Sequence, residues 1–204
     1  MTLRVVVGVS GASGAVIAVR IVELLATLGV AVDLVISSAA ERTLAQEIDT
    51  AAADRLRARA DIAHAIDDIG ATIASGSYPI AGMIVAPCSM RTLAAIAHSL
   101  SDNLLVRAAD VQLKERRPLI LLARETPLHL GHLRAMTAVT EMGAIVMPPV
   151  PAFYRRPSSV DEIVDHSARR AIDQLRIGPQ VAGPWNPPRH SSASSVSESG
   201  GSGQ

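Results

Sequence analysis

The stretch Leu3-Arg-Val-Val-Val-Gly-Val-Ser-Gly-Ala-Ser-Gly14 decides the fold of this 204-residue chain. Its first half is a short apolar run rich in β-branched residues, which is typical of a strand buried on both faces of a sheet. A glycine-rich turn follows, and an amphipathic pattern then runs from about Ala15 to Leu28 and stops at Gly29. A buried strand that leads through such a turn into a helix predicts the first unit of a parallel α/β sheet.

The same alternation of strand and helix signals continues along the chain. It predicts an α/β fold with three layers, a Rossmann- or flavodoxin-like doubly wound parallel sheet with helices on both faces. A capping box, Ser159-Val-Asp-Glu162, opens the last helix. The predicted strands cover residues 3–10, 31–37, 81–86, 118–123 and 144–147, and the predicted helices cover residues 15–28, 39–48, 51–65, 91–98, 103–114, 128–142 and 159–176.

Composition predicts one domain, residues 1–178, followed by a tail. Residues 179–204 are rich in proline, serine and glycine, and the part after about residue 191 has too little apolar surface to order itself. Lys and Arg number 19 against 19 Asp and Glu, and aromatic residues are 2% of the chain, which disfavours nucleic acid and membrane surfaces as partners.

Other sequence features predict a cytoplasmic protein. No apolar run reaches the roughly 18 residues that span a bilayer, and the N-terminus lacks the charged and apolar pattern of a signal peptide. The single cysteine, Cys88, has no partner for an internal disulfide and fits a reducing compartment. We expect Cys88 to be a buried structural thiol.

The candidate functional segments all follow strands. In parallel sheets, ligands bind beyond the carboxyl ends of the strands. The run from Gly8 to Gly14 lacks the spacing of a dinucleotide fingerprint and the Gly-Lys-Ser/Thr of a P-loop. Its glycines and the helix N-terminus after it suit a phosphate slightly better than they suit plain tight packing. Further along, Ser89 and Thr92 suit helix capping and ligand binding equally well.

The only lysine, Lys114, stands against 18 arginines. An ammonium is a compact point charge, whereas a guanidinium is a flat fork, so a lone lysine suggests a position that arginine cannot fill. Lys114 and Arg107 are seven positions apart, on one face of the predicted helix. Arg124 and Glu125 end a buried strand, where charge is costly unless it is paired or functional.

No metal site is expected. His129 and His132 have a spacing that can bind a metal, but no third ligand is evident in the sequence, so capping or solvation is favoured for both. Asp67 and Asp68 are not followed by the further acid that a magnesium diphosphate site would use.

From residue 3 to 176 the chain resembles the UbiX-type flavin prenyltransferases, formerly described as aromatic-acid decarboxylase subunits. The most specific motifs are Lys114-Glu-Arg-Arg-Pro118 and Arg124-Glu-Thr-Pro127 at their mutual spacing; Gly11-Ala-Ser-Gly-Ala15, Val35-Ile-Ser-Ser-Ala-Ala40, Pro87-Cys-Ser89 and Pro148-Pro-Val-Pro-Ala-Phe-Tyr154 support them. The resemblance implies a flavin-binding domain that transfers a dimethylallyl group from dimethylallyl phosphate to N5 and C6 of reduced FMN without a metal. It also implies that prenylated FMN passes to a partner decarboxylase, and that the protein is a homo-oligomer, a dodecamer with its site between subunits.

The resemblance also implies site residues. Catalytic roles fall to Lys114, Glu125, Glu47 and Ser13. FMN would contact Gly11, Ala12, Ser13, Ser37, Ser89, Met90, Arg91, Thr92 and Arg124. The prenyl phosphate would contact Arg107, Lys114, Arg124, Tyr154, Arg170 and Trp185.

Two other functions stay open on the sequence. An FMN-dependent cysteine decarboxylase would share the sheet, but it would use a histidine near the first strand and an Asn-rich motif where this chain has Pro87-Cys-Ser-Met-Arg91. A non-catalytic flavin-binding subunit would have no need of Lys114 and Glu125, which suit a departing phosphate.

Overall fold

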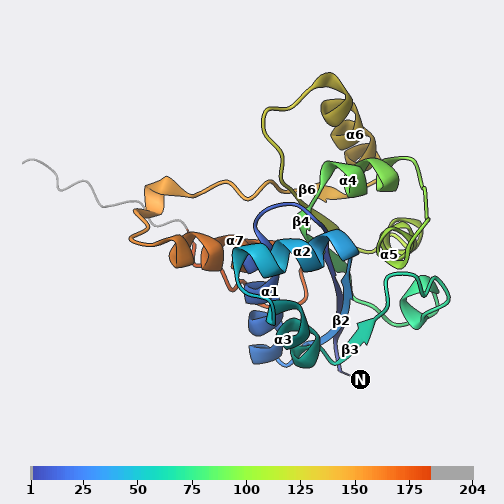
Figure 1. Ribbon diagram of the computed structural model, residues 1–204, viewed down its shortest axis with the longest axis horizontal. Coiled ribbons are helices and arrows are strands. Elements are labelled where there is room, and N and C mark those ends of the chain that lie inside the picture. The colour runs from blue at the N-terminus through green and yellow to red at the C-terminus, as the bar shows by residue number, and fades with distance from the viewer. Residues whose placement is uncertain (1, 185–204) are drawn as a thin grey trace, which may run out of the picture.

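The computed structural model describes residues 2–184 and contains one six-stranded sheet with helices on both faces (Figure 1). All its strand pairs are parallel, in the order β3-β2-β1-β4-β5-β6. This confirms the predicted doubly wound fold. The strands are β1 (Arg4–Val9), β2 (Ala31–Ile36), β3 (Ile62–His64), β4 (Met83–Cys88), β5 (Leu119–Ala123) and β6 (Ile145–Val146).

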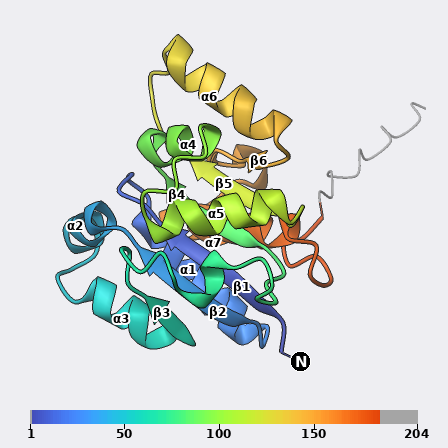
Figure 2. The same cartoon turned by 90° about the vertical axis from the view of Figure 1, so that its right-hand side faces the viewer.

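The helices fall into two layers around two apolar cores. α1 (Ala15–Thr27) and α7 (Val160–Gln174) pack side by side on one face of the sheet, and α5 (Leu104–Lys114) covers the other face (Figure 2). The remaining helical elements are α2 (Ser38–Glu47), α3 (Ala52–Arg59), α4 (Met90–Ala97), α6 (Leu130–Glu141) and the 3-10 turns η1 (Thr72–Ala74) and η2 (Phe153–Arg155).

The central strands form as predicted because their side chains are apolar on both faces. Every residue of β2, β4 and β5 is buried, as a strand covered by helices on both sides requires. Asp33 is the charged exception: its carboxylate accepts hydrogen bonds from Arg4 Nη1 at 2.8 Å and lies 2.6 Å from His64 Nε2. Partners on two neighbouring strands thus offset the cost of burying this charge.

The predicted helix over residues 51–65 is wrong in its second half. The helix ends at Arg59, because Ala60 adopts an extended conformation, and Ile62–His64 forms the edge strand β3 beside β2. The Asp61 carboxylate accepts a hydrogen bond of 2.8 Å from the Val32 amide and so fixes the register. This tertiary pairing outweighs the helical propensity of the alanines nearby.

The ordered chain reaches past the predicted domain boundary at residue 178. The Asp173 carboxylate accepts hydrogen bonds from the amides of Val181, at 2.7 Å, and Ala182, at 3.3 Å, and Ala182 is buried. The predicted disorder after about residue 191 falls outside the described residues. Among residues 2–184, no helix has the length and apolar character needed to cross a membrane.

Candidate active site

The order of the sheet reverses between β1 and β4. Parallel sheets bind their ligands in the crevice at the carboxyl edge of such a switch point. Ser10 joins the loops that follow these two strands. Its hydroxyl donates to the Pro87 carbonyl at 2.8 Å and accepts from the Ser89 amide at 2.7 Å. Sequence reasoning missed this role, because the partners of Ser10 lie almost 80 positions away in the chain. A buried serine at the end of an apolar strand is the only local signal.

The first loop needs its glycines for two separate reasons. A Cβ on Gly11 would lie 2.4 Å from the Ala39 Cβ, so only glycine lets the start of α2 approach this closely. Gly14 has a φ of 105°, in the left-handed region that favours glycine. Ser13 lies between them and is exposed, so its side chain is open to a ligand.

Glu47, at the end of α2, occupies the N-terminus of α1. Its carboxylate accepts the Gly14 amide at 3.0 and 3.1 Å and the Ala15 amide at 2.8 Å. These amides are among the free donors of a helix start, and a carboxylate stabilises them and the helix dipole. The helix start that the sequence suggested for a phosphate is therefore already partnered at Gly14 and Ala15. The structure brings Glu47 to the loop that carries Ser13, as the predicted site requires.

Ser37 and Ser89 both cap helices. The Ser37 hydroxyl accepts the Ala40 amide at 3.1 Å, and the Ser89 hydroxyl accepts the Thr92 amide at 3.3 Å and donates to the Thr92 hydroxyl at 3.1 Å. Capping uses one lone pair of a hydroxyl, so the Ser37 proton, the second lone pair of Ser89 and the Thr92 proton stay available to a ligand. Both functions that the sequence left open for Ser89 are therefore compatible.

The other residues that were predicted to contact FMN differ in solvent exposure. Met90 is buried beneath the loop, and Arg91 is exposed and paired with Asp102 at 2.7 Å. Arg124 follows β5 and is exposed, and within the described part of the chain its guanidinium has no hydrogen bond or ion pair. Glu125 beside it accepts the Thr126 amide at 3.0 Å. Arg124 is thus a free cation at the same edge as the serine loops.

Lys114 lies at the opposite edge of the sheet. It ends α5, with four residues between it and the start of β5, whereas Arg124 directly follows the end of β5. Five strand residues at about 3.3 Å each separate the two edges by roughly 16 Å. The Lys114 ammonium lies against Gly76 and Glu115 near its own edge, so this chain does not bring the two predicted phosphate ligands together. Arg107, higher on α5, pairs with Asp110 at 2.8 Å.

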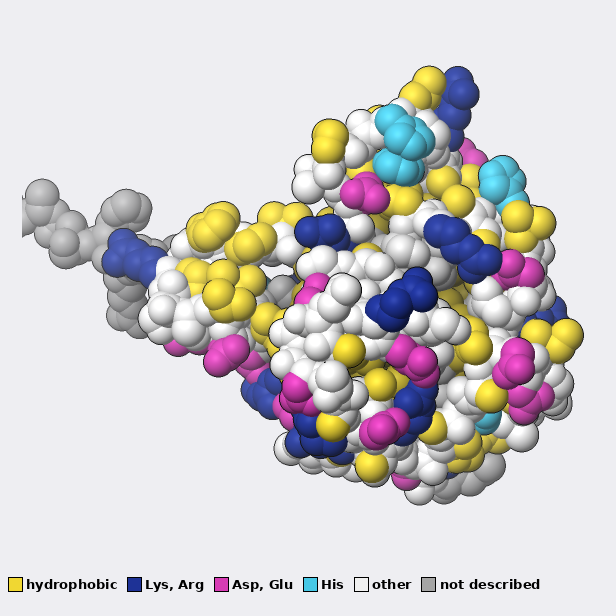
Figure 3. Space-filling model, in the orientation of Figure 1, with side chains coloured by type: hydrophobic (Ala, Val, Ile, Leu, Met, Phe, Trp, Pro, Cys, Tyr) yellow, Lys and Arg dark blue, Asp and Glu magenta, His cyan; other side chains and the backbone are white. Residues whose placement is uncertain are grey.

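Tyr154 and Arg170 lie on two other segments. Residues 148–158 form an arm that leaves the body of the protein (Figure 1), and yellow hydrophobic side chains gather along it (Figure 3). Phe153 and Tyr154 on this arm are 72% and 57% exposed. Arg170 lies in the second half of α7, which ends at Gln174, and the side chain of the next residue, Leu175, packs against Gly82 at the amino edge of the sheet. Trp185 falls outside the described residues.

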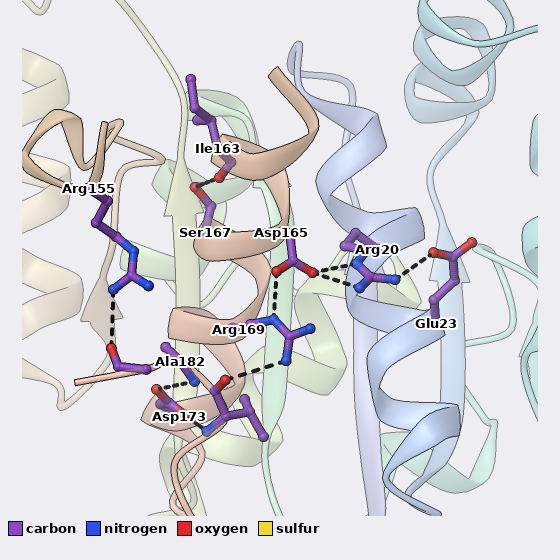
Figure 4. Close-up of polar contacts among 11 residues, drawn as sticks. Arg20, Glu23, Arg155, Ile163, Asp165, Ser167, Arg169, Asp173 and Ala182 are labelled. Atoms are coloured by element: carbon purple, nitrogen blue, oxygen red, sulfur yellow. Dashed lines mark hydrogen bonds and ion pairs between the residues drawn. The ribbon is translucent and has the colours of Figure 1, made fainter. Parts of the chain in front are cut away.

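A groove of about 790 Å³ lies between α1, α7 and the arm. Figure 4 shows its polar lining: Asp165 binds Arg20 at 2.7 Å and Arg169 at 2.6 Å. Burial raises the pKa of Asp165, but the hydrogen bonds from Arg169 and Arg20 outweigh it and hold the pKa below its usual range. These contacts join α7 to α1, so we interpret them as structural.

The structure confirms the expected role of Cys88, which is fully buried, and burial raises the pKa of its thiol to about 12. The rings of His129 and His132 stack with centroids 3.6 Å apart, and His129 Nδ1 accepts the Gly131 amide at 3.0 Å, which confirms a capping role. Within residues 2–184, no group of three or more His, Cys, Asp or Glu side chains is placed to hold a metal ion.

The donor set at the carboxyl edge fits FMN. The exposed side chain of Ser13, the capping hydroxyls of Ser37 and Ser89, the Thr92 hydroxyl and the unpaired Arg124 all lie on or next to the loops at this edge. Hydroxyls and one cation are the groups that a ribityl chain and a phosphate recruit.

Comparison with known proteins identifies the family. A flavoprotein family model matches residues 1–171. The flavin prenyltransferase UbiX of Thauera aromatica is 54% identical over 183 residues, which cover 90% of this chain and 94% of that protein. The chain belongs to the UbiX flavin prenyltransferase family.

Solved structures of this family agree with the fold. AnUbiX (PadA1), in complex with FMN and dimethylallyl pyrophosphate, has a TM-score of 0.87 and 43% identity, covering 92% of this chain and 99% of that one. A dodecameric, FMN-dependent UbiX-like decarboxylase from Escherichia coli O157:H7 has a TM-score of 0.83 and 44% identity, covering 86% and 96%.

Proposed function

We propose that this protein is a flavin prenyltransferase that converts reduced FMN and dimethylallyl phosphate into prenylated FMN and inorganic phosphate. The observation that carries this proposal is the convergence of hydroxyl-bearing loops and the unpaired Arg124 at the switch point of the sheet, in a chain 54% identical to a UbiX protein. Reduced FMN, when bound, supplies the nucleophilic N5 and C6. The allylic carbon–oxygen bond breaks, and its electron pair leaves with the phosphate.

The residues of the carboxyl edge would bind and orient the flavin. Ser37 and Thr92 would donate hydrogen bonds from their hydroxyl protons, and Ser89, whose proton is given to Thr92, would accept one. Ser13 would contact the flavin, and Glu47, which holds the loop that carries Ser13, would lie near the reacting edge of the flavin and take part in proton transfer there. Glu125, next to Arg124, is placed to take a proton released in the reaction.

The phosphate site would be completed by neighbouring copies of the chain. A monophosphate leaves readily only when preplaced cations meet its developing charge. Arg124 is the cation at the crevice, while Lys114, Arg170 and the exposed arm with Tyr154 lie elsewhere on the same chain. We therefore propose a homo-oligomer, a dodecamer like the E. coli relative, in which Lys114, Arg107, Tyr154 and Arg170 reach the Arg124 site from adjacent subunits. We further propose that prenylated FMN passes to a decarboxylase in the cytoplasm.

Mixed oligomers test this arrangement. Lys114→Ala and Arg124→Ala should each lower the rate of phosphate release from dimethylallyl phosphate at least tenfold, and Lys114→Ala should leave FMN affinity near normal. When the two variants are co-expressed, some sites combine a wild-type Lys114 with a wild-type Arg124, so activity should return in part. Mixed oligomers as inactive as the separate variants would show that both residues come from one chain.

A further inference from the structure

The lysine of the proposed phosphate site already has an anionic partner. Lys114 Nζ forms an ion pair with the Glu115 carboxylate, and the pair is partly open to solvent, with side-chain exposures of 45% and 35%. The hydrogen bond from Lys114 lowers the pKa of Glu115 below its usual range, so Glu115 is ionised throughout the neutral range. Any phosphate that binds Lys114 must therefore compete with a carboxylate one residue away.

The Lys114–Glu115 pair packs against Gly76. A Cβ at Gly76 would lie 2.0 Å from Glu115 Oε1 and 2.6 Å from Lys114 Nζ, so the two charged groups rest directly against the glycine. Gly76 is not among the residues with positive φ, so its conformation is open to other residues. Its missing side chain, and not its backbone freedom, is what the pair uses.

Arg117 links the loop that contains Gly76 to the end of α5. Its guanidinium donates to the carbonyl of Gly76 at 2.6 Å and to the carbonyl of Tyr78 at 3.0 Å. The Arg117 amide also donates to the Gln112 carbonyl at 2.8 Å and so closes the last turn of the helix. The loop beneath the pair and the helix that carries the pair are therefore held as one unit, and Lys114 is presented in a defined place.

We propose that Glu115 is an internal counter-ion that competes with the substrate phosphate for Lys114 and speeds release of the phosphate product. This rests on the proposed function of Lys114. A phosphate monoester carries close to two charges at neutral pH, whereas Glu115 carries one, so a doubly charged phosphate displaces the carboxylate more readily than a singly charged anion. After transfer, the return of Glu115 to Lys114 opposes rebinding of inorganic phosphate.

The test measures binding of inorganic phosphate to the FMN-loaded full-length protein by titration calorimetry. Glu115→Gln should tighten phosphate binding roughly two- to fivefold, the scale of an exposed ion pair, and should lower KM for dimethylallyl phosphate similarly. Glu41→Gln, which removes a carboxylate from the exposed pair with Arg57, is the matched control and should leave phosphate binding unchanged. Glu115→Asp keeps the negative charge, but its shorter side chain no longer reaches the Lys114 ammonium. This variant should therefore also bind inorganic phosphate more tightly than the wild-type protein.

A double-mutant cycle separates this effect from general electrostatics. In the Lys114→Ala background, Glu115→Gln should no longer change phosphate affinity. Unchanged or weaker phosphate binding in Glu115→Gln, or the same gain without Lys114, would overturn the inference. Absence of prenyl transfer by the wild-type protein would instead overturn the proposed function, so the two failures are distinguishable.

Discussion

Replacing Glu47 separates its structural contact from its proposed catalytic role. Glu47→Ala removes the acceptor of the Gly14 and Ala15 amides, which lie 2.8 to 3.1 Å from its carboxylate. Loss of a helix cap costs about 0.5–2 kcal/mol, and because the Glu47 carboxylate accepts two amides we expect about 1–2 kcal/mol here. For a chain of this size that corresponds to a fall in Tm of about 2–8 °C.

The amide variant Glu47→Gln should behave differently. Its remaining carbonyl oxygen can still accept both amides, so we expect a loss below about 1 kcal/mol. Because glutamine cannot take up a proton as a carboxylate does, the rate of prenyl transfer should fall at least tenfold while Tm stays nearly normal. A rate that follows Tm in both variants would limit Glu47 to positioning the loop.

Thermal unfolding followed by circular dichroism measures the stability effect, and mass analysis of the flavin gives the rate. Glu41→Ala is the matched control, since Glu41 lies on the same helix but pairs only at the surface, where loss of an ion pair costs about 0–1 kcal/mol. If Glu47→Ala has the same Tm as this control, the cap described above contributes nothing and the reasoning is refuted.

Three further outcomes follow from the described contacts. Asp165 has a lowered pKa, so it stabilises the folded state above the usual aspartate pKa and loses that contribution as the pH falls through its folded value. Asp165→Asn should therefore flatten the loss of Tm as the pH falls below the usual aspartate pKa, and an unchanged slope would contradict this. Cys88 should react with a thiol reagent only after denaturation, because burial raises its pKa to about 12, and rapid labelling of the native protein would argue against that burial. Gly11→Val should lower both Tm and FMN affinity, because its Cβ would lie 2.4 Å from Ala39; normal flavin titration of this variant would show that the loop can move.

The sequence predicted the elements whose cause is local. Strands buried on both faces read as continuous apolar runs, and serine caps such as Ser159, whose hydroxyl accepts the Glu162 amide at 3.2 Å, depend on residues three positions apart. The edge strand Ile62–His64 escaped prediction because only its pairing with β2 defines it. Its alanine-rich flank resembles a helix until the neighbouring strand is known.

The sequence predicted the part of the candidate site at the carboxyl edge of the sheet better than it predicted the position of Lys114. The loops after β1, β2, β4 and β5 had to meet, because parallel strands end at one edge. The cross-links made by Ser10 and Glu47 were not visible, since both join segments more than 30 positions apart. Lys114 is far from Arg124 because α5 and β5 run in opposite directions. Lys114 ends α5 near the amino edge of the sheet, and Arg124 follows β5 at the carboxyl edge. A motif shared in sequence thus does not by itself place two residues in one site.

Prenyl transfer to the flavin is best measured by mass spectrometry of the flavin itself. The full-length protein is incubated anaerobically with reduced FMN and dimethylallyl phosphate, the flavin is released by denaturation, and inorganic phosphate is measured in parallel. We predict a flavin that has gained one five-carbon prenyl unit, with one phosphate released for each unit gained. Recovery of unmodified FMN, with the protein folded and the flavin bound, would contradict prenyl transfer by this protein.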